Sequence, residues 1–349
     1  MGKKIIYCAD GTWATPATHT NVYKVFKAVT ISSAQMAFYD DGVGSDGLPL
    51  ERLAGGAFGT GLWQKIKDGY AKIAHVYEKD DQVYIFGFSR GAYTARSLAG
   101  MIAACGLPTH DFGDDDLEVA FNAYRDKSSR GDLLRRLNAS CDMYNAPIEM
   151  IGVWDTVGSL GIPSLFGQVD PVLYGFLDVG LNPGVRNAYH AIAIDEKRAE
   201  FPVTLWKPPF APGQTVEQVY FCGCHSDVGG GNPDEADGSA LSNITLAWMM
   251  SKAAALGIGF NPQMVQSFNC PTDPKYALDN INESWTPLWA FPVKRQIAGN
   301  AWIANSVAIR AAEFNSYRPT NLAFKDGVLG NYTMIDVVTQ PGAVSKAGS

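Results

Sequence analysis

The chain has 349 residues, enough for one large α/β domain with insertions, and it carries a formal net charge of −7. Its hydrophobic content of 46% and charged content of 18% indicate a globular protein with a sizeable core and exclude a disordered chain. An acidic chain lacks the basic field that a general nucleic-acid surface needs, so we expect no nucleic acid among its partners.

Short apolar strands alternate with helical patterns along the chain. Strand-like runs precede Asp10 and cover 36–44, 82–88, 148–155 and 217–224. Helical spacing covers 21–29, 60–77, 90–104, 115–139 and 243–257, and we also place His190 in a helix. This alternation predicts an α/β fold with a mainly parallel sheet and helices on both faces. We expect one domain over 1–349, with insertions at 106–146, 156–185 and 258–301 and a frayed tail at 340–349.

The N-terminus, MGKKIIYCADGTW, has too few apolar residues before Asp10 for the core of a signal peptide. The sequence contains no run of about 18 apolar residues, so we predict no spanning helix. A chain of this size does not need its six cysteines as disulfides, and we expect Cys8 and Cys222 to be buried free thiols. Together these features predict synthesis in the cytoplasm without a signal peptide.

Three predicted strands end in segments that carry reactive side chains: FGFSRGA, VWDTVGS and FCGCHSDVGGG. In an open parallel sheet the carboxyl ends of the strands meet at one edge, where ligands usually bind. We therefore expect Ser89, Asp155 and His225 to lie on the same rim of the sheet.

Ser89 lies in Gly87-Phe88-Ser89-Arg90-Gly91, which matches the G-x-S-x-G nucleophile elbow between a strand and a helix. The sharp turn needs small residues two positions before and two positions after the serine. The N–H of Arg90, at the start of the helix, would then stabilise an oxyanion. The alternative is a phosphate-binding turn or a purely structural glycine turn.

The order of the remaining candidates along the chain favours a catalytic triad. Asp155 follows a strand and either orients a histidine or caps the loop that follows it. Among the five histidines, at 19, 75, 110, 190 and 225, only His225 follows a strand end after Asp155. The residues alone therefore nominate Ser89, Asp155 and His225, in the order used by hydrolases of this fold class.

A zinc site is a further interpretation of the third strand end, where Cys222, Cys224, His225 and Asp227 are crowded together. Structural zinc sites usually draw ligands from a second cluster at characteristic spacing, and the sequence contains none. We therefore expect no metal and no organic cofactor.

Seven blocks in order resemble the DUF2235 α/β-hydrolase family, which includes the Tle1-type phospholipase effectors of type VI secretion. The blocks are CADGTW, YDDGVGS, GFSRGAYTAR, VWDTVGSLG, HAIAIDEKR with a later Phe, HSDVGGG, and SVAIR followed by YRPTNL. The resemblance covers about residues 4 to 325 and implies an α/β-hydrolase-like fold with lid-like insertions. It implies Ser89 as nucleophile, Asp155 as acid, and the turn at 10–12 as the source of a second oxyanion N–H, from Gly11 or Thr12. A plain turn is the alternative for that loop.

The resemblance and the order of residues along the chain point to different positions for the catalytic histidine. The family's histidine lies in a late H-x-S-V motif ahead of an arginine, and this position is Ala304 here, followed by Asn305-Ser306-Val307 and later Arg310. The resemblance thus implies an enzyme inactivated at Ala304, either by deliberate replacement or naturally. His225 is then the reserve base.

These inferences predict a serine ester hydrolase that acts on lipid esters, most plausibly a phospholipase. The alternatives are a non-catalytic hydrolase-fold binding module and a soluble carboxylesterase that uses His225. The aromatic stretch 283–295, with Trp285, Trp289 and Phe291, is either core or a lid beside a lipid cleft. Expected partners are a phospholipid or other ester, a peripheral membrane contact, and a secretion-system or immunity protein, with delivery to target cells by type VI secretion.

Overall fold

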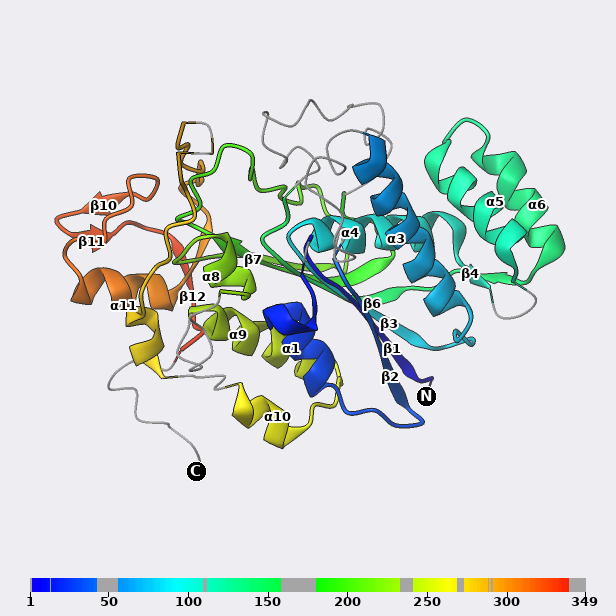
Figure 1. Cartoon of the computed structure of the whole chain (residues 1–349), viewed down its shortest axis with the longest axis horizontal. Coiled ribbons are helices and arrows are strands. Elements are labelled where there is room, and N and C mark those ends of the chain that lie inside the picture. The colour runs from blue at the N-terminus through cyan, green and yellow to red at the C-terminus, as the bar shows by residue number, and fades with distance from the viewer. Residues whose placement is uncertain are drawn as a thin grey trace.

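The computed structural model describes residues 2–12, 14–42, 56–108, 112–157, 180–232, 241–268, 273–287, 289 and 291–338. At its centre lies an eight-stranded sheet in the order β12-β9-β8-β7-β6-β3-β1-β2 (Figure 1). All its strand pairs are parallel. The strands are β1 Lys4–Ala9, β2 Gln35–Asp40, β3 Gln82–Phe88, β6 Ile148–Trp154, β7 Val185–Ala193, β8 Thr215–Phe221, β9 Trp302–Ala304 and β12 Thr333–Ile335.

The central strands are apolar throughout because both faces of the sheet are covered. In β1, Ile5 and Tyr7 pack into one core cluster, whereas Ile6 and Cys8 pack into the other. All four side chains are fully buried. The alternation of side chains along a strand therefore divides a single apolar run between two hydrophobic layers.

Helices cover both faces, as the sequence predicts (Figure 1). The first layer contains α3 Gly56–Ala74, α4 Arg90–Cys105, α5 Asp114–Arg125 and α6 Arg130–Ser140. The second layer contains α1 Asn21–Ala28, α9 Leu241–Ala255 and α11 Asn305–Glu313. The shorter elements are η1 Pro16–Thr18, α8 His225–Gly229, α10 Pro262–Ser267, η4 Pro274–Leu278 and the pairs β4 Leu107–Pro108 with β5 Met143–Tyr144 and β10 Phe324–Lys325 with β11 Val328–Leu329.

The prediction of a helix at His190 is wrong, because this residue lies in β7 opposite Val153 of β6. The buried free thiols of Cys8 and Cys222 are confirmed. Most of the segment 156–185 and the tail 340–349 lie outside the described residues, so the predicted insertions there stay predictions.

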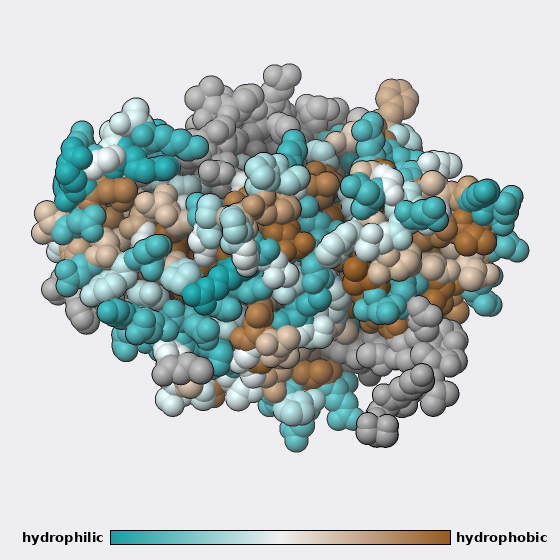
Figure 2. Space-filling view, turned by 180° about the vertical axis from the view of Figure 1, so that it is seen from behind, coloured by the Kyte–Doolittle hydropathy of each residue, from teal (hydrophilic) through white to brown (hydrophobic). Residues whose placement is uncertain are grey.

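No helix in the described ranges is both long and apolar enough to span a bilayer. On the face seen in Figure 2, apolar residues form separate patches among hydrophilic ones wherever the surface is not grey. Ser89, Asp155 and His225 follow the carboxyl ends of β3, β6 and β8.

Candidate active site

Ser89 occupies the sharp turn between β3 and α4. Its backbone has φ 59° and ψ −124°, a positive-φ conformation that is strained for a residue other than glycine. The Ser89 N–H donates to the carbonyl of Trp154 at 3.0 Å, which ties the turn to the end of β6. A strained serine on a strand–turn–helix junction is the geometry of a nucleophile elbow.

The two glycines of the motif are required by close backbone approach. A Cβ on Gly87 would lie 2.6 Å from the carbonyl oxygen of Gly91, and one on Gly91 would lie 2.3 Å from the carbonyl oxygens of Ala9 and Asp10. Since these contacts involve backbone atoms, the chain could relieve them only by moving β1 or α4. The pattern G-x-S-x-G is thus explained by the packing of the helix start against two strands.

His225 lies between Ser89 and Asp155. Its Nε2 is 2.8 Å from the Ser89 Oγ, and its Nδ1 is 2.5 Å from Oδ2 of Asp155. With the Nδ1–H donating to the carboxylate, Nε2 is left to accept the serine hydroxyl proton. Ser89 and His225 are buried almost completely, with 5% and 6% of their surface exposed, and Asp155 has none.

Asp155 is held from three sides. Its Oδ1 accepts the N–H of Ala193 at 2.9 Å, and Arg295 donates to both carboxylate oxygens, at 2.5 Å to Oδ1 and 2.9 Å to Oδ2. Complete burial by itself would raise the pKa of Asp155, but the charge of Arg295 and the hydrogen bond from His225 outweigh it and hold that pKa well below its usual range. The acid therefore stays ionised next to the imidazole.

Two aromatic rings enclose the imidazole of His225. The ring of Phe88 lies 4.6 Å from it and that of Phe201 lies 5.0 Å away in an edge-on arrangement. Burial lowers the pKa of His225, and this effect exceeds the opposing pull of Asp155. Gly229 leaves room for Phe88, since a Cβ there would come within 1.9 Å of the phenyl ring. The histidine is thus kept neutral and fixed in orientation.

The backbone of the short helix α8 is fixed by two buried carboxylates. Glu196 accepts the N–H of His225 at 3.2 Å, and Asp227 accepts the N–H of Cys224 at 2.8 Å. The Arg198 guanidinium pairs with Glu196 and, against the effect of burial, lowers the pKa of that carboxyl to about 2. The sequence motif H-S-D-V-G-G-G therefore builds a rigid support for the imidazole.

The alternative of a zinc site at this strand end gains no support. Burial raises the pKa of the thiols of Cys222 and Cys224 to about 12, which disfavours the thiolate that zinc requires. Asp227 is already occupied by N–H donors from Cys224 and Asn282. Within the described ranges, no group of three or more histidine, cysteine, aspartate or glutamate residues could hold a metal ion.

The loop after β1 approaches Ser89 closely. A Cβ on Gly11 would lie 3.2 Å from the Cβ of Ser89, a tight contact. The Gly11 N–H donates to Asp10 at 2.7 Å and is therefore engaged. Burial raises the pKa of Asp10 to about 6, although hydrogen bonds from Thr20, Tyr39 and Gly11 oppose this rise. Of the two predicted donors in this loop, Thr12 is the one whose N–H is not used by Asp10.

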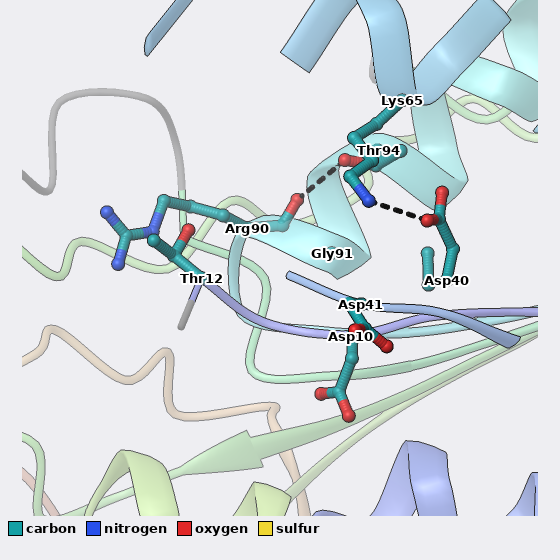
Figure 3. A pocket seen from close by; sticks show the side chains of 9 residues that line it. Asp10, Thr12, Asp40, Asp41, Lys65, Arg90, Gly91 and Thr94 are labelled. Atoms are coloured by element: carbon teal, nitrogen blue, oxygen red, sulfur yellow. Dashed lines mark hydrogen bonds and ion pairs between the residues drawn. The ribbon is translucent and has the colours of Figure 1, made fainter. Parts of the chain in front are cut away.

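A small pocket borders this loop and the start of α4. It is lined by Ala9, Asp10, Thr12, Asp40, Asp41, Lys65, Arg90, Gly91 and Thr94. Figure 3 shows Thr12 beside the side chain of Arg90, while Lys65 is paired with Asp40 at 2.7 Å. Arg90 is the first residue of α4, so its backbone N–H lies at the N-terminal end of the helix, where the helix dipole favours negative charge. Thr12 and Arg90 thus flank the elbow from two sides.

The structure does not bring position 304 to Ser89, in contrast to the expectation drawn from the resemblance. Ala304 ends β9, which is four strands from β3, or about 19 Å at the usual strand spacing. Its surroundings are structural: the side chain of Asn305 bonds the backbone of Val337 and Val338, and Arg310 bonds the carbonyl of Ala277. His225 occupies the place beside Ser89 and Asp155 instead.

The aromatic stretch divides into packed and exposed parts. Trp289 meets the ring of Phe201 edge-on at 5.5 Å. The guanidinium of Arg198 lies 3.6 Å from the ring centre of Phe201 and 5.1 Å from that of Trp289. Trp285 is half-buried, whereas Phe291 is 89% exposed. Trp289 therefore packs one ring away from the imidazole, and Phe291 projects into solvent.

Sequence reasoning missed Arg295 and Glu196 as site residues. Glu196 lies in the block HAIAIDEKR, and a charged residue directly after a buried strand was the available signal. Arg295 lies in an irregular segment 140 residues after Asp155, and no periodicity or motif marks it.

Comparison with known families now adds independent information. The family model described as T6SS, phospholipase effector Tle1-like, catalytic domain, matches residues 3–252. The chain belongs to the Tle1-like phospholipase effector family. The matched range of this Tle1-like domain includes Ser89, Asp155 and His225 and ends before position 304.

Other relatives of this Tle1-like chain are distant. The uncharacterized protein YEL023C of Saccharomyces cerevisiae is 28% identical over 239 residues, covering 60% of this chain and 34% of that protein. The chain thus spans about a third of the length of this curated relative.

Two solved structures resemble the chain in part. An uncharacterized protein from Pseudomonas aeruginosa is 17% identical with a TM-score of 0.45, covering 76% of this chain and 49% of that one. The Tle1 effector bound to the VgrG spike from the Type 6 secretion system is 13% identical with a TM-score of 0.46, covering 82% of each chain.

Proposed function

We propose that this protein is a serine hydrolase that cleaves an acyl ester bond of phospholipids. Ser89 is the nucleophile, His225 the general base and Asp155 the acid that orients it. The observation that supports this most is the position of His225, hydrogen-bonded to Ser89 Oγ at 2.8 Å and to Asp155 at 2.5 Å. A missing histidine at position 304 does not inactivate the enzyme in this proposal, since another histidine provides the base.

The reaction follows from these contacts. The Ser89 Oγ attacks the acyl carbonyl carbon while Nε2 of His225 takes the hydroxyl proton. The N–H groups of Arg90 and Thr12 hold the resulting oxyanion. His225 then gives its proton to the departing alcohol oxygen, which leaves as a lysophospholipid and leaves the acyl group on Ser89. A water molecule, deprotonated by His225, attacks the acyl-enzyme, and Ser89 regains its proton as the fatty acid departs.

The lipid nature of the substrate rests on family membership and on the surroundings of the imidazole. The match to a phospholipase effector domain covers the three proposed residues. Phe88 and Phe201 pack against the imidazole and Trp289 packs against Phe201, and apolar surroundings of this kind suit an acyl chain. A water-soluble ester would gain less from them.

Labelling and hydrolysis assays test the proposal together. Purified protein is treated with a fluorophosphonate probe, and hydrolysis of a phospholipid in mixed micelles is compared with that of a short p-nitrophenyl ester. We expect labelling at Ser89, loss of labelling in Ser89→Ala, and faster turnover of the phospholipid. Hydrolysis of the short ester alone would favour the carboxylesterase, and failure to label or hydrolyse would favour a non-catalytic binding module.

We extend the proposal to delivery. The family description names type VI secretion, and one solved effector is bound to a VgrG spike, so we infer that this chain is carried by a secretion-system partner. Co-purification with the spike protein encoded nearest to its gene tests this inference. If the tagged chain recovers no spike protein while still hydrolysing phospholipid, the enzymatic proposal stands and the delivery proposal fails.

A further inference from the structure

An irregular segment crosses the back of the catalytic histidine and ends on the triad acid. We call the described residues between Asn282 and Arg295 the strap; none of them lies in a helix or strand. The strap begins at Asn282, whose backbone N–H and Nδ2 both donate to Asp227 on α8, at 3.1 and 2.6 Å. It is therefore attached at its start to the helix that carries His225.

Further attachments lie along the strap, including an ion pair between Glu283 and Lys197. The Ser284 hydroxyl donates to Glu196, the carboxylate that accepts the N–H of His225. The Val293 N–H donates to the carbonyl of Lys197 at 2.7 Å. The middle of the strap thus follows the loop after β7, and the last attachment is made by Arg295.

Arg295 is nearly buried, and both of its Nη atoms are hydrogen-bonded. Its two Nη atoms donate to both oxygens of Asp155, to the carbonyl of Ala193 and to the carbonyl of Phe201. Only 8% of the residue is exposed. A buried guanidinium needs a carboxylate of matching geometry, and the planar two-oxygen pair provides both charge compensation and direction.

We propose that Arg295 is a positioning residue of the triad, which keeps Asp155 charged and aimed at His225 and couples the strap to the catalytic groups. This inference rests on the proposed function, since it assigns a role to Arg295 through Asp155. His225 contacts only one oxygen of the Asp155 carboxylate. Arg295 contacts both oxygens, and its two Nη donors therefore fix the plane of the carboxylate. Ala193 supplies the only other hydrogen bond to this carboxylate among the described residues.

The charges around this pair determine the effect of pH. The titratable and charged groups that act on Asp155 and His225 from the surrounding elements are Arg295, Tyr220, His190, Glu196 and Arg198. Tyr220 and His190 are neutral near pH 7, because burial raises the pKa of the tyrosine and lowers that of the histidine to about 3. Glu196 and Arg198 compensate each other as a pair. Of these groups, Arg295 is thus the cation that pairs with Asp155 itself.

Removing that cation should make the pair bind a proton more readily. In Arg295→Met we expect the acid limb of kcat/KM to move to higher pH by about one unit, the scale typical of a neighbouring charge. At pH 7 we expect kcat/KM to fall roughly ten-fold or more, in the range seen for lost orienting partners. In Arg295→Lys the charge remains but the fork is lost, so kcat should fall while the acid limb and KM stay near those of the parent.

Arg310→Met is the matched control. Arg310 has the same 8% exposure, and its guanidinium bonds the carbonyls of Ala277 and Asp279 rather than the triad. We expect this variant to lose some thermal stability and to keep the pH profile of the parent. A shift of the acid limb in Arg310→Met as large as in Arg295→Met would overturn the inference, because it would show a general effect of losing a buried arginine.

The low-field proton NMR signal of the His225 Nδ1–H gives a readout that does not require turnover. Its pH titration should move upward in Arg295→Met and remain in place in Arg295→Lys. If Arg295→Met does not fold, as judged by circular dichroism, Arg295→Lys decides: a folded lysine variant with parental kcat would overturn the positioning role. If the parent protein shows the NMR signal but neither labelling nor hydrolysis, the proposed function fails. If both folded Arg295 variants keep the parental NMR titration and kinetic constants, only the inference about Arg295 is refuted.

Discussion

The Nε2 atom of His225 lies 2.8 Å from the Oγ atom of Ser89, although 136 positions of sequence separate the two residues. The parallel sheet produces this contact, because β3 and β8 end at the same edge and α8 turns back from that edge toward the elbow. Ser89 and Asp155 both have positive φ, at 59° and 41°, so two members of this constellation are held in strained backbone.

The identity of the base can be decided by two substitutions. We expect His225→Ala to lower kcat by about 10⁴-fold or more, since a triad acts as a unit. Ala304→His should give no increase, because position 304 is four strands away from β3. As Ala304 is fully buried, the added ring should destabilise the fold by about 1–3 kcal/mol. Hydrolysis of a p-nitrophenyl ester and thermal unfolding measure both effects; a gain in Ala304→His would return the base to position 304.

The pH dependence follows from the direction of the shift at His225. The base must be neutral, and burial lowers the pKa of His225 below the ordinary 6.5, so activity should persist below pH 6.5. In the unfolded chain this histidine binds a proton more readily than in the fold. Its contribution to stability is therefore unfavourable at acid pH and disappears as pH rises through 6.5. A kcat/KM profile with its acid limb above 6.5 would contradict the neutral, desolvated imidazole.

Gly91 offers a test of the elbow packing. Gly91→Ala should destabilise the protein by at least about 1–3 kcal/mol, because the added methyl would lie 2.3 Å from two backbone oxygens. Gly131→Ala, on α6, is the control: its nearest neighbour would be the flexible end of Arg135 at 3.7 Å, and a helical alanine should stabilise by about 0.5–1 kcal/mol. Urea unfolding of both variants checks the contrast. Equal stability of the two would mean that the helix start can move away from β1 at little cost.

Contact with lipid can be separated from packing by comparing two aromatic residues. Phe291→Ala should weaken binding to phosphatidylcholine vesicles without changing the melting temperature, since the side chain is 89% exposed. Trp289→Ala should lower the melting temperature as well, because that ring packs against Phe201. Ile31→Ala is the control, since Ile31 is 64% exposed and precedes β2, at the opposite end of the strands from Ser89. If Phe291→Ala binds vesicles as the parent does, the exposed ring has no part in lipid contact.

The sequence predicted most of what depends on local pattern. Apolar runs located the central strands, and the glycines around Ser89 marked a turn whose packing explains them. The order along the chain nominated the three residues that the structure places in contact, whereas the resemblance placed the histidine on Ala304 at the end of β9. Arg295 could not be found because its role depends on a long-range ion pair, for which an irregular segment gives no periodic signal. His190 was misplaced because nine residues of a buried strand can also fit a helical pattern.

The nearly complete burial of Ser89 and His225 has a kinetic consequence. Only 5% and 6% of their surfaces are exposed, so we expect neighbouring side chains to move aside before an ester carbonyl reaches the Oγ atom. Opening would then precede bond formation on every turnover, and the slowest step would be a conformational change rather than the chemical step. Turnover should slow as glycerol or sucrose raises the viscosity of the solution. It should change little between esters with good and poor leaving groups. If turnover instead depends strongly on the leaving group and does not change with viscosity, the rate-limiting step is attack on the acyl carbon.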